Sequence, residues 1–232
     1  MNNVKQGRGI LIQPNGDYYQ GYFQNDLANG KGILYLKDEY KYTGLWKNNS
    51  KEGEGVEVYL ATGDKYEGNF KENSKEGKGK YTYKDGTIYI GTFVNSKFEG
   101  EGTIDWIDGR KYIGEFKNGK MHGSGKFIWP KGLEFEGQYD KGYKNGFGIL
   151  RCQKGKTIKG YWRNNVLHGK ANIINEDNEI VVEMLYRYGK IIKMISPRDN
   201  KILINGIGEM SHRINASPLI LNEMEFIGNT KI

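Results

Sequence analysis

The stretch "YIGEFKNGKMHGSGKFIWPKG", from Tyr112 to Gly132, decides the fold because its pattern returns along most of the chain. With its leading residue as position 1, the copies begin at Tyr19, Tyr42, Tyr66, Tyr89, Tyr112, Phe135 and Ile158. The spacing between successive starts is constant, except that the second copy is longer by one. Self-similarity at a fixed period predicts an array of repeats, in which each repeat contacts its neighbours.

Two positions of the repeat hold the same kind of residue in all seven copies. Position 3 is always glycine: Gly21, Gly44, Gly68, Gly91, Gly114, Gly137 and Gly160. Position 5 is always aromatic: Phe23, Trp46, Phe70, Phe93, Phe116, Tyr139 and Trp162. Because alternate residues of a β-strand share a face, positions 1, 3 and 5 are predicted to lie on one face of a strand.

A second strand is predicted over positions 12 to 16. Position 12 is always glycine, position 14 is glycine except for Ala171, and position 16 is apolar in every copy except Glu57. Position 8, between the strands, holds Asp, Asn, Ser or Gly, which favour turns. Each copy is therefore predicted to be a β-hairpin, and the hairpins to stack into one antiparallel sheet, because a lone hairpin is marginal in water.

The abundant glycines, 34 in 232 residues, raise the alternative of a phosphate-binding loop. Such loops require G-x-G-x-x-G between a strand and a helix, or G-x-x-x-x-G-K-S/T. The paired glycines lack the third glycine, and no helical pattern follows them. We therefore interpret them as shallow slots in the sheet, into which a ring of a neighbouring repeat presses.

These residues resemble the MORN repeat (membrane occupation and recognition nexus), whose pattern is Y-x-G-x-W/F-x-x-G-x-x-H/N-G-x-G. The stretch from Tyr112 to Gly125 fits every specified position. The resemblance implies an all-β fold, an elongated single-layer antiparallel sheet of about eight hairpin repeats. We expect a repeat array over residues 1–195, comprising a half-repeat (1–18), seven repeats (19–181) and a decayed repeat (182–195). Residues 196–232 leave the period and are expected to form a C-terminal cap or a docking arm.

Two departures from the pattern carry expectations of their own. Position 11 is acidic in the second to fourth copies, at Glu52, Glu76 and Glu99. The second copy contains one residue more than the others, which predicts a bulge or a longer loop near Tyr59 to Asp64.

No residues suggest catalysis, a metal site or a cofactor, so a non-enzymatic protein is expected. His122 and His168 both occupy position 11, which predicts a role in the repeat rather than in a zinc site. Cys152 is the only cysteine, which excludes an intramolecular disulfide and fits a reducing compartment. The chain starts with a polar segment and holds no run of about 18 apolar residues, so a soluble, unsecreted protein is expected.

The formal charge of +7 raises the question of nucleic acid or anionic lipid. Lysines and glutamates are interleaved in the repeats, as in "FKENSKEGKGKYTYKDG" from Phe70 to Gly86, which favours a solvated face of the sheet. We expect no nucleic-acid partner. Peripheral binding to an anionic membrane stays open as the alternative function.

The aromatic residues of position 5 have two compatible interpretations. They form the stacking layer of the sheet, and, because a single layer leaves its faces uncovered, they are also expected to form an exposed stripe. Such a stripe would line a groove for a helix or an extended segment of a partner protein. Phe23, Trp46, Phe70, Phe93, Phe116, Tyr139 and Trp162 are thus the predicted partner-binding residues. A homodimer through the C-terminal repeats stays open.

The resemblance also implies a class of function. MORN repeats serve as protein–protein interaction scaffolds in cytoskeletal and membrane-associated assemblies, including radial spokes of ciliary axonemes, basal bodies and the cell cortex of protists. The abundance of Asn, Ile and Lys is typical of translation from an AT-rich genome. The expectation is an intracellular scaffold of the cytoskeleton, in the axoneme of a cilium or flagellum or at the cortex. An accessory module that acts in trans on a kinase or methyltransferase is a third alternative.

Overall fold

The structure is a computed structural model that describes residues 4–153 and 155–205. It divides into an N-terminal part, Met1–Gly109 with Phe116–Gly119, and a C-terminal part, Arg110–Glu115 with Lys120–Ile232. The described residues form 18 β-strands, one short 3-10 helix and no α-helix. Residues 206–232 lie outside the described residues, so the cap or docking arm over 196–232 stays a prediction.

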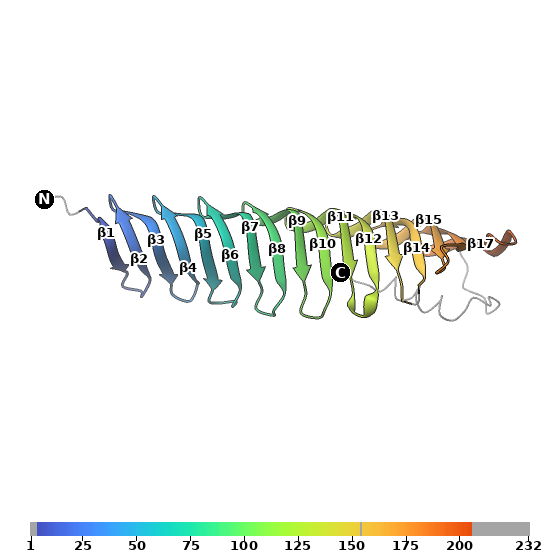
Figure 1. Cartoon of the computed structure of the whole chain (residues 1–232), viewed down its shortest axis with the longest axis horizontal. Coiled ribbons are helices and arrows are strands. Elements are labelled where there is room, and N and C mark those ends of the chain that lie inside the picture. The colour runs from blue at the N-terminus through green and yellow to red at the C-terminus, as the bar shows by residue number, and fades with distance from the viewer. Residues whose placement is uncertain (1–3, 154, 206–232) are drawn as a thin grey trace. The chain divides into compact units, whose positions relative to one another are not determined.

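The N-terminal part is an antiparallel sheet in which each strand pairs with the next along the chain. Figure 1 shows these strands side by side in chain order. They are β1 (Gly7–Ile12), β2 (Tyr18–Gln24), β3 (Leu27–Leu36), β4 (Tyr40–Lys47), β5 (Ser50–Tyr59), β6 (Lys65–Lys71), β7 (Ser74–Thr82), β8 (Ile88–Val94) and β9 (Lys97–Asp105).

The C-terminal part repeats this arrangement, with antiparallel pairs from β11 to β18. Its elements are β10 (Lys111–Lys117), whose last residues belong to the N-terminal part, β11 (Lys120–Ile128), η1 (Pro130–Gly132), β12 (Glu134–Asp140), β13 (Tyr143–Arg151), β14 (Thr157–Arg163), β15 (Val166–Ile174), β16 (Ile180–Arg187), β17 (Lys190–Ser196) and β18 (Lys201–Asn205). The predicted all-β fold of stacked antiparallel hairpins is confirmed.

The turn inside each hairpin has the geometry that its residues favour. Positions 7 and 8 both have positive φ, as at Asn48 (47°) and Asn49 (65°), which is the type I′ turn of tight hairpins. The turn also binds the preceding repeat, because the Asn49 N–H donates to the Ala28 carbonyl at 3.0 Å. The Asn49 carboxamide oxygen accepts from the Ala28 N–H at 2.7 Å. Asn at position 8 therefore both shapes its own hairpin and fastens it to the one before.

The glycine at position 12 serves a bulge in the second strand of the hairpin. Gly44 pairs with Gly55 and Trp46 with Lys51, so the step between these pairs is longer on β5 than on β4. Gly53 lies inside this bulge with φ of 74°. Since residues with a side chain rarely adopt that conformation, the repeat requires glycine here.

The extra residue of the second copy lengthens one turn between hairpins, as predicted. The Tyr59 N–H donates to the carbonyl of Asp64. In the turns that start at Gln13, Tyr83 and Trp129, the corresponding acceptor is one residue nearer along the chain. The extra residue therefore lies in the turn at the ends of β5 and β6, and the pairing of these two strands is not interrupted.

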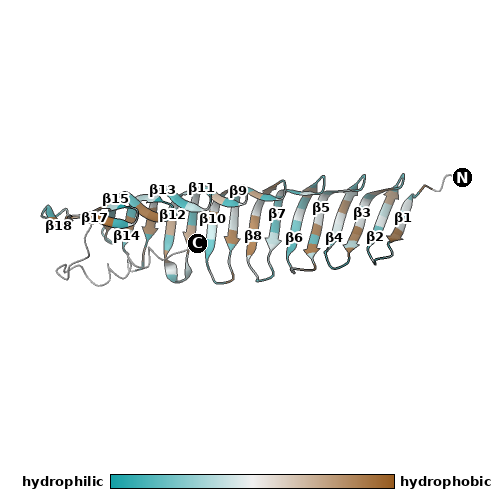
Figure 2. Cartoon of the chain, turned by 180° about the vertical axis from the view of Figure 1, so that it is seen from behind, coloured by the Kyte–Doolittle hydropathy of each residue, from teal (hydrophilic) through white to brown (hydrophobic). Residues whose placement is uncertain are grey.

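The two faces of each sheet differ because buried and exposed residues alternate along the first strands. In β8 the residues Tyr89, Gly91 and Phe93 are buried, while Ile90 and Val94 are exposed. Figure 2 shows hydrophobic and hydrophilic residues following one another along the strands. One face therefore carries positions 1, 3 and 5, and the other carries positions 2 and 4.

Candidate partner-binding surfaces

The position-1 rings lie flat over the paired glycines of their own hairpin. The ring of Tyr42 covers both Gly44 and Gly55, and a Cβ added at Gly55 would lie 2.5 Å from that ring. The Tyr42 hydroxyl donates to the carbonyl of Leu45 at 2.9 Å, which fixes the ring in place. We expected a ring from a neighbouring repeat in this slot, and that expectation is wrong. The first strand turns its own position-1 ring along the sheet, because the two paired glycines leave a space deep enough for it.

The position-5 rings stand edge-on between two position-1 rings. Phe93 contacts Tyr89 of its own repeat, with ring centroids 5.3 Å apart at 88°. It also contacts Tyr66 of the preceding repeat, at 4.9 Å and 75°. The same pair of contacts recurs at Trp46 and Phe70 in the N-terminal part and at Tyr139 in the C-terminal part, and Phe116 contacts Tyr89 of the preceding repeat. Edge-to-face geometry is the favourable one for aromatic pairs, so each sheet carries a self-supporting row of rings.

The seven predicted partner-binding residues are buried in this row. Their exposed fractions are 9% for Phe23, 8% for Trp46, 3% for Phe70, 1% for Phe93, 3% for Phe116, 3% for Tyr139 and 2% for Trp162. The expectation of an exposed stripe is therefore wrong, because rings packed edge-on and flat cover one another without a second layer. That a partner contacts these residues stays a prediction, and such a partner would have to displace rings that now cover them.

Position 10 completes the aromatic face, and sequence reasoning missed it. Phe98 stacks on Tyr89 with centroids 3.7 Å apart, and the ammonium groups of Lys51, Lys75 and Lys144 lie over the position-1 rings of their own repeats. The position-10 residues are Ala28, Lys51, Lys75, Phe98, Met121, Lys144 and Leu167. Three lysines hide the pattern, yet all three are buried. The apolar residues that recur at the repeat period were the signal that could have found it.

Two of these lysines neutralise the one acidic residue of position 16. Glu57 is 4% exposed, and its carboxylate accepts a hydrogen bond from the Lys75 ammonium at 2.9 Å. The Lys51 ammonium and the Tyr59 hydroxyl donate to the same carboxylate. Burial would raise the pKa of Glu57, but the hydrogen bonds from Lys51 and Tyr59, together with the positive charges of Lys51 and Lys75, hold the pKa below its ordinary value. The exception at position 16 is thus matched by Lys at position 10 of its own repeat and the next.

The third lysine, Lys144, lies among aromatic rings. Its ammonium is 4.7 Å from the ring centre of Trp129, 5.0 Å from that of Phe135 and 5.1 Å from that of Trp162. The side chain is 1% exposed, and burial lowers its pKa to about 8. Attraction to the rings partly replaces the lost water. At neutral pH the Lys144 amine is therefore still protonated, and its burial lowers the free energy of unfolding.

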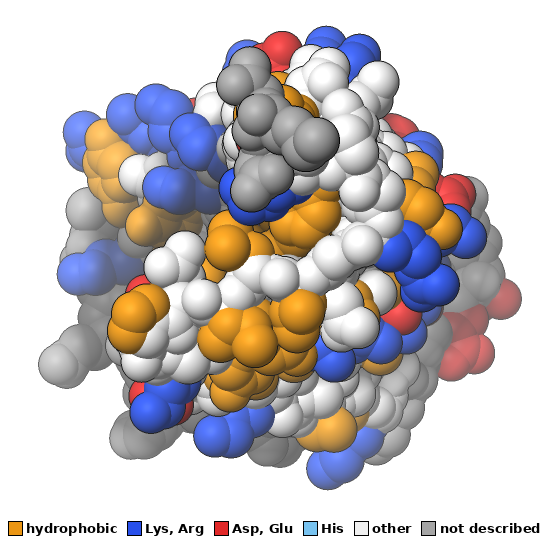
Figure 3. Space-filling view, turned by 90° about the vertical axis from the view of Figure 1, so that its left-hand side faces the viewer, with side chains coloured by type: hydrophobic (Ala, Val, Ile, Leu, Met, Phe, Trp, Pro, Cys, Tyr) orange, Lys and Arg blue, Asp and Glu red, His pale blue; other side chains and the backbone are white. Residues whose placement is uncertain are grey.

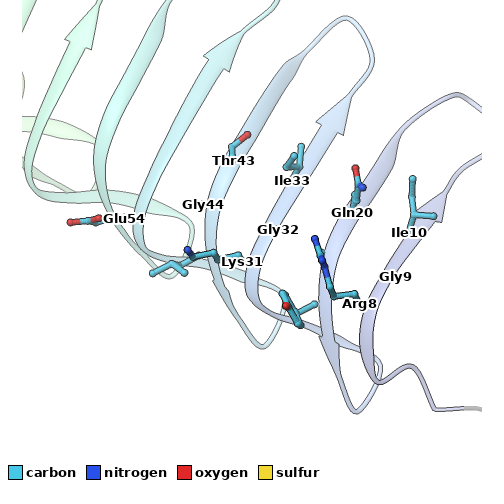
Figure 4. A pocket seen from close by; sticks show the side chains of 13 residues that line it. Arg8, Gly9, Ile10, Gln20, Lys31, Gly32, Ile33, Thr43, Gly44 and Glu54 are labelled. Carbon is cyan, nitrogen blue, oxygen red and sulfur yellow. The ribbon is translucent and has the colours of Figure 1, made fainter.

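The opposite face of the N-terminal part carries an open groove of about 820 Å³. Figure 4 shows its floor at Gly9, Gly32 and Gly44, between two rows of side chains. One row contains Ile10, Gln20, Ile33 and Thr43, and the other contains Arg8, Lys31 and Glu54. Tyr22, which pairs with Arg8, and Leu45, which pairs with Lys31, also line the groove. A second hollow of about 470 Å³ continues over Gly55 and Gly68. Ile10, Tyr22 and Leu45 are 56%, 45% and 37% exposed, so apolar surface is available there.

A model of the MORN repeat matches this chain in eight consecutive segments. They are residues 1–18, 19–39, 42–59, 66–88, 89–109, 112–134, 135–157 and 159–171. This chain belongs to the MORN repeat family. The match starts at residue 1, so the MORN pattern extends over the N-terminal half-repeat as well.

Solved structures give distant likenesses to this MORN protein. The TCP domain of Drosophila melanogaster SAS-4 (dCPAP), in complex with a proline-rich motif of Ana2 (dSTIL), is 11% identical with a TM-score of 0.43, over 78% of this chain and 89% of that one. The TCP10 domain of Danio rerio CPAP, in complex with a STIL peptide, is 14% identical with a TM-score of 0.34, over 87% of this chain and 100% of that one. Scores this low carry no argument about function. No curated protein matches the chain.

Position 11 of the MORN pattern supplies a hydrogen-bond acceptor to the next repeat. The Asn29 side-chain oxygen accepts from the Asn48 N–H at 3.3 Å, and the Glu99 carboxylate accepts from the Asn118 N–H at 2.9 Å. His168 does the same through Nδ1, which accepts from the Tyr188 N–H at 3.2 Å. The acidic departures and His168 therefore do the same thing, because each of these side chains accepts a hydrogen bond from a backbone N–H of the next repeat.

The described residues offer no built site for a metal ion. They contain no cluster of three or more His, Cys, Asp or Glu side chains close enough to share one. His122 lies 3.4 Å from the Asp140 carboxylate, in the place where the other position-11 residues meet the next repeat. In residues 4–153 and 155–205 no helix is long and apolar enough to cross a bilayer.

Proposed function

We propose that this MORN array is a non-enzymatic scaffold that binds partner proteins in a cytoskeletal assembly. The setting we favour is the axoneme of a cilium or flagellum, in a radial-spoke-like assembly, or the cell cortex. The support is the repeated architecture itself, in which hydrogen bonds at positions 8 and 11 and the row of rings fasten each hairpin to the next. A fastened array presents fixed, evenly spaced contacts to a partner.

The groove over the glycines is the observation that carries the proposal. Its walls combine exposed apolar and aromatic side chains, including Tyr22, with Arg8, and both tyrosine and arginine are enriched in protein interfaces. Successive hairpins lie about 10 Å apart, and an extended chain advances about 3.3 Å per residue. An extended segment of a partner would thus meet an equivalent glycine floor about every third residue.

The test is capture of partners by a tagged chain from a cell that makes it, followed by mass spectrometry. We expect a stoichiometric set of cytoskeletal proteins at moderate salt. The groove variant is Tyr22→Ala with Leu45→Ala, and the matched control is Ile107→Ala. Ile107 is 70% exposed and lies outside the groove. The groove variant should lose the partners, and the control should keep them.

Two results would count against the proposal. Capture that is equal for the wild type and the groove variant would remove the groove as the binding surface. Recovery of the bare chain, together with sedimentation on anionic liposomes that ends when salt is added, would favour the membrane alternative, because adsorption by charge is screened.

A further inference from the structure

Strand β1 is the second strand of a hairpin whose first strand is not among the described residues. Gly7, Gly9 and Leu11 occupy positions 12, 14 and 16 of the repeat. Gly7 has φ of 79°, close to the 77° of Gly30, so β1 already has the bulged shape of a second strand. Within the part of the chain that the structure describes, β1 pairs with β2 alone, and all six of its residues are exposed.

The free edge of β1 offers a regular set of backbone hydrogen-bonding groups. The Gln13 N–H donates to the carbonyl of Asp17, which begins the ladder between β1 and β2. In an antiparallel ladder alternate residues bond to the same neighbour, so Leu11 and Gly9 bond toward β2. The N–H and C=O groups of Arg8, Ile10 and Ile12 therefore point outward, and an added strand can pair with them.

The aromatic face next to this edge has a slot without a ring. At Gly79, another position-14 glycine, an added Cβ would lie 2.6 Å from the ring of Tyr66. At Gly9 the nearest atom to an added Cβ is the ring edge of Phe23, at 3.4 Å. Leu11, at position 16, is 41% exposed, whereas Leu150 at the same position is 2% exposed. Figure 3 shows hydrophobic side chains gathered at this end of the molecule, with lysine and arginine side chains around them.

We propose that the β1 edge binds, in trans, an extended segment of a partner protein with the sequence aromatic-x-Gly-x-aromatic. The segment pairs antiparallel with β1 in the way that the first strand of a complete hairpin pairs with the second, as β2 pairs with β3. Its first ring lies opposite Leu11 and covers Gly9, and its glycine lies opposite Gly9, as Gly21 lies opposite Gly32. This sequence pattern is taken from the first strands of the complete hairpins of this chain, which pair with their second strands in the same way. The site goes beyond the proposed scaffold function, because it uses the strand edge and the aromatic face rather than the groove.

The test uses the full chain and a peptide with the sequence of residues 111–119, "KYIGEFKNG", which contains a first strand of this chain. NMR titration should shift the amide signals of Arg8 and Ile10, and hydrogen exchange at Ile10 should slow. A peptide carrying Tyr112→Ala should bind at least tenfold more weakly. Gly9→Ala in the chain should also weaken binding at least tenfold, because its Cβ occupies the slot.

Two further variants keep the proposal falsifiable. Ile10→Pro removes an outward N–H that β2 does not use, so the fold should persist while the peptide loses its hydrogen bond. Tyr22→Ala with Leu45→Ala alters the groove and should leave peptide affinity unchanged, which separates this site from the proposed function. Peptide binding that survives both Gly9→Ala and Ile10→Pro would overturn the proposal. So would a dimer of the chain alone that Gly9→Ala dissociates, since the occupant would then be a second copy.

Discussion

Replacing Lys144 with methionine should stabilise the protein at neutral pH. Methionine is the residue at position 10 of the preceding repeat, Met121, and it fills a similar volume without a charge. Burial lowers the pKa of Lys144 from its ordinary 10.5 to about 8. At about 1.4 kcal/mol for each pKa unit, holding the protonated amine costs roughly 3 kcal/mol at pH 7. Attraction to the three rings offsets part of this cost, so we expect Lys144→Met to gain about 1–2 kcal/mol.

The same residue predicts how stability depends on pH. The unfolded chain keeps the lysine protonated up to about pH 10.5, whereas the folded chain releases the proton near pH 8. The unfolded state therefore binds more protons between these values, and the free energy of unfolding rises with pH. From pH 7.5 to 9.5 the wild type should therefore gain about 2 kcal/mol of stability relative to Lys144→Met. Burial raises the pKa of tyrosines such as Tyr89 and Tyr139 in the folded chain, so ionisation of the unfolded chain toward pH 10 lowers stability equally in both proteins, and the difference between them isolates Lys144.

The assay is urea unfolding followed by tryptophan fluorescence at several pH values in that window. Trp129 and Trp162 contact Lys144, so the signal reports on this site. The matched control is Lys170→Met, at an exposed position, which should change stability by less than about 0.5 kcal/mol. A Lys144→Met variant that is less stable than the wild type at pH 7, with a stability difference between the two proteins that stays constant from pH 7.5 to 9.5, would refute the reasoning.

Glu57→Gln should lower the free energy of unfolding by about 3 kcal/mol in urea titrations at pH 7, because it leaves Lys51 and Lys75 buried without a counter-charge. Replacing all three by leucine should restore stability to near the wild-type value, and a triple variant as weak as Glu57→Gln would contradict this account. Gly79→Ala should lower the melting temperature, with a loss of about 1–3 kcal/mol, because its Cβ would lie 2.6 Å from the ring of Tyr66. Gly9→Ala, whose Cβ has 3.4 Å of room, is its control and should stay within about 0.5 kcal/mol of the wild type; equal losses in the two would argue against the ring slot.

Much of the fold was predictable because the repeat is built from local rules. Alternation of period two assigned positions 1, 3 and 5 to one face of a strand. The turn-favouring residues at position 8 predicted the tight turns, and the extra residue before Asp64 predicted the longer one. Each of these inferences depends on residues within one hairpin, where the backbone leaves few choices.

The interactions between repeats were decided by the tertiary structure. Whether the slot over Gly44 holds Tyr42 or a ring from the next repeat depends on how a side chain lies across two strands, which spacing alone does not specify. The burial of Phe93 arises in part from Tyr66, which belongs to the preceding repeat.

The charged residues of the aromatic face show the same division. The sequence by itself determined that hairpins repeat and which residue types alternate along them, because those features follow from local backbone geometry. The structure decided that Lys51 and Lys75 pair with Glu57 and that Lys144 lies among rings, because these contacts form only when hairpins stack. The stacking of hairpins also leaves a groove on the face opposite the aromatic rings. Among the described residues it leaves β1 with a free edge.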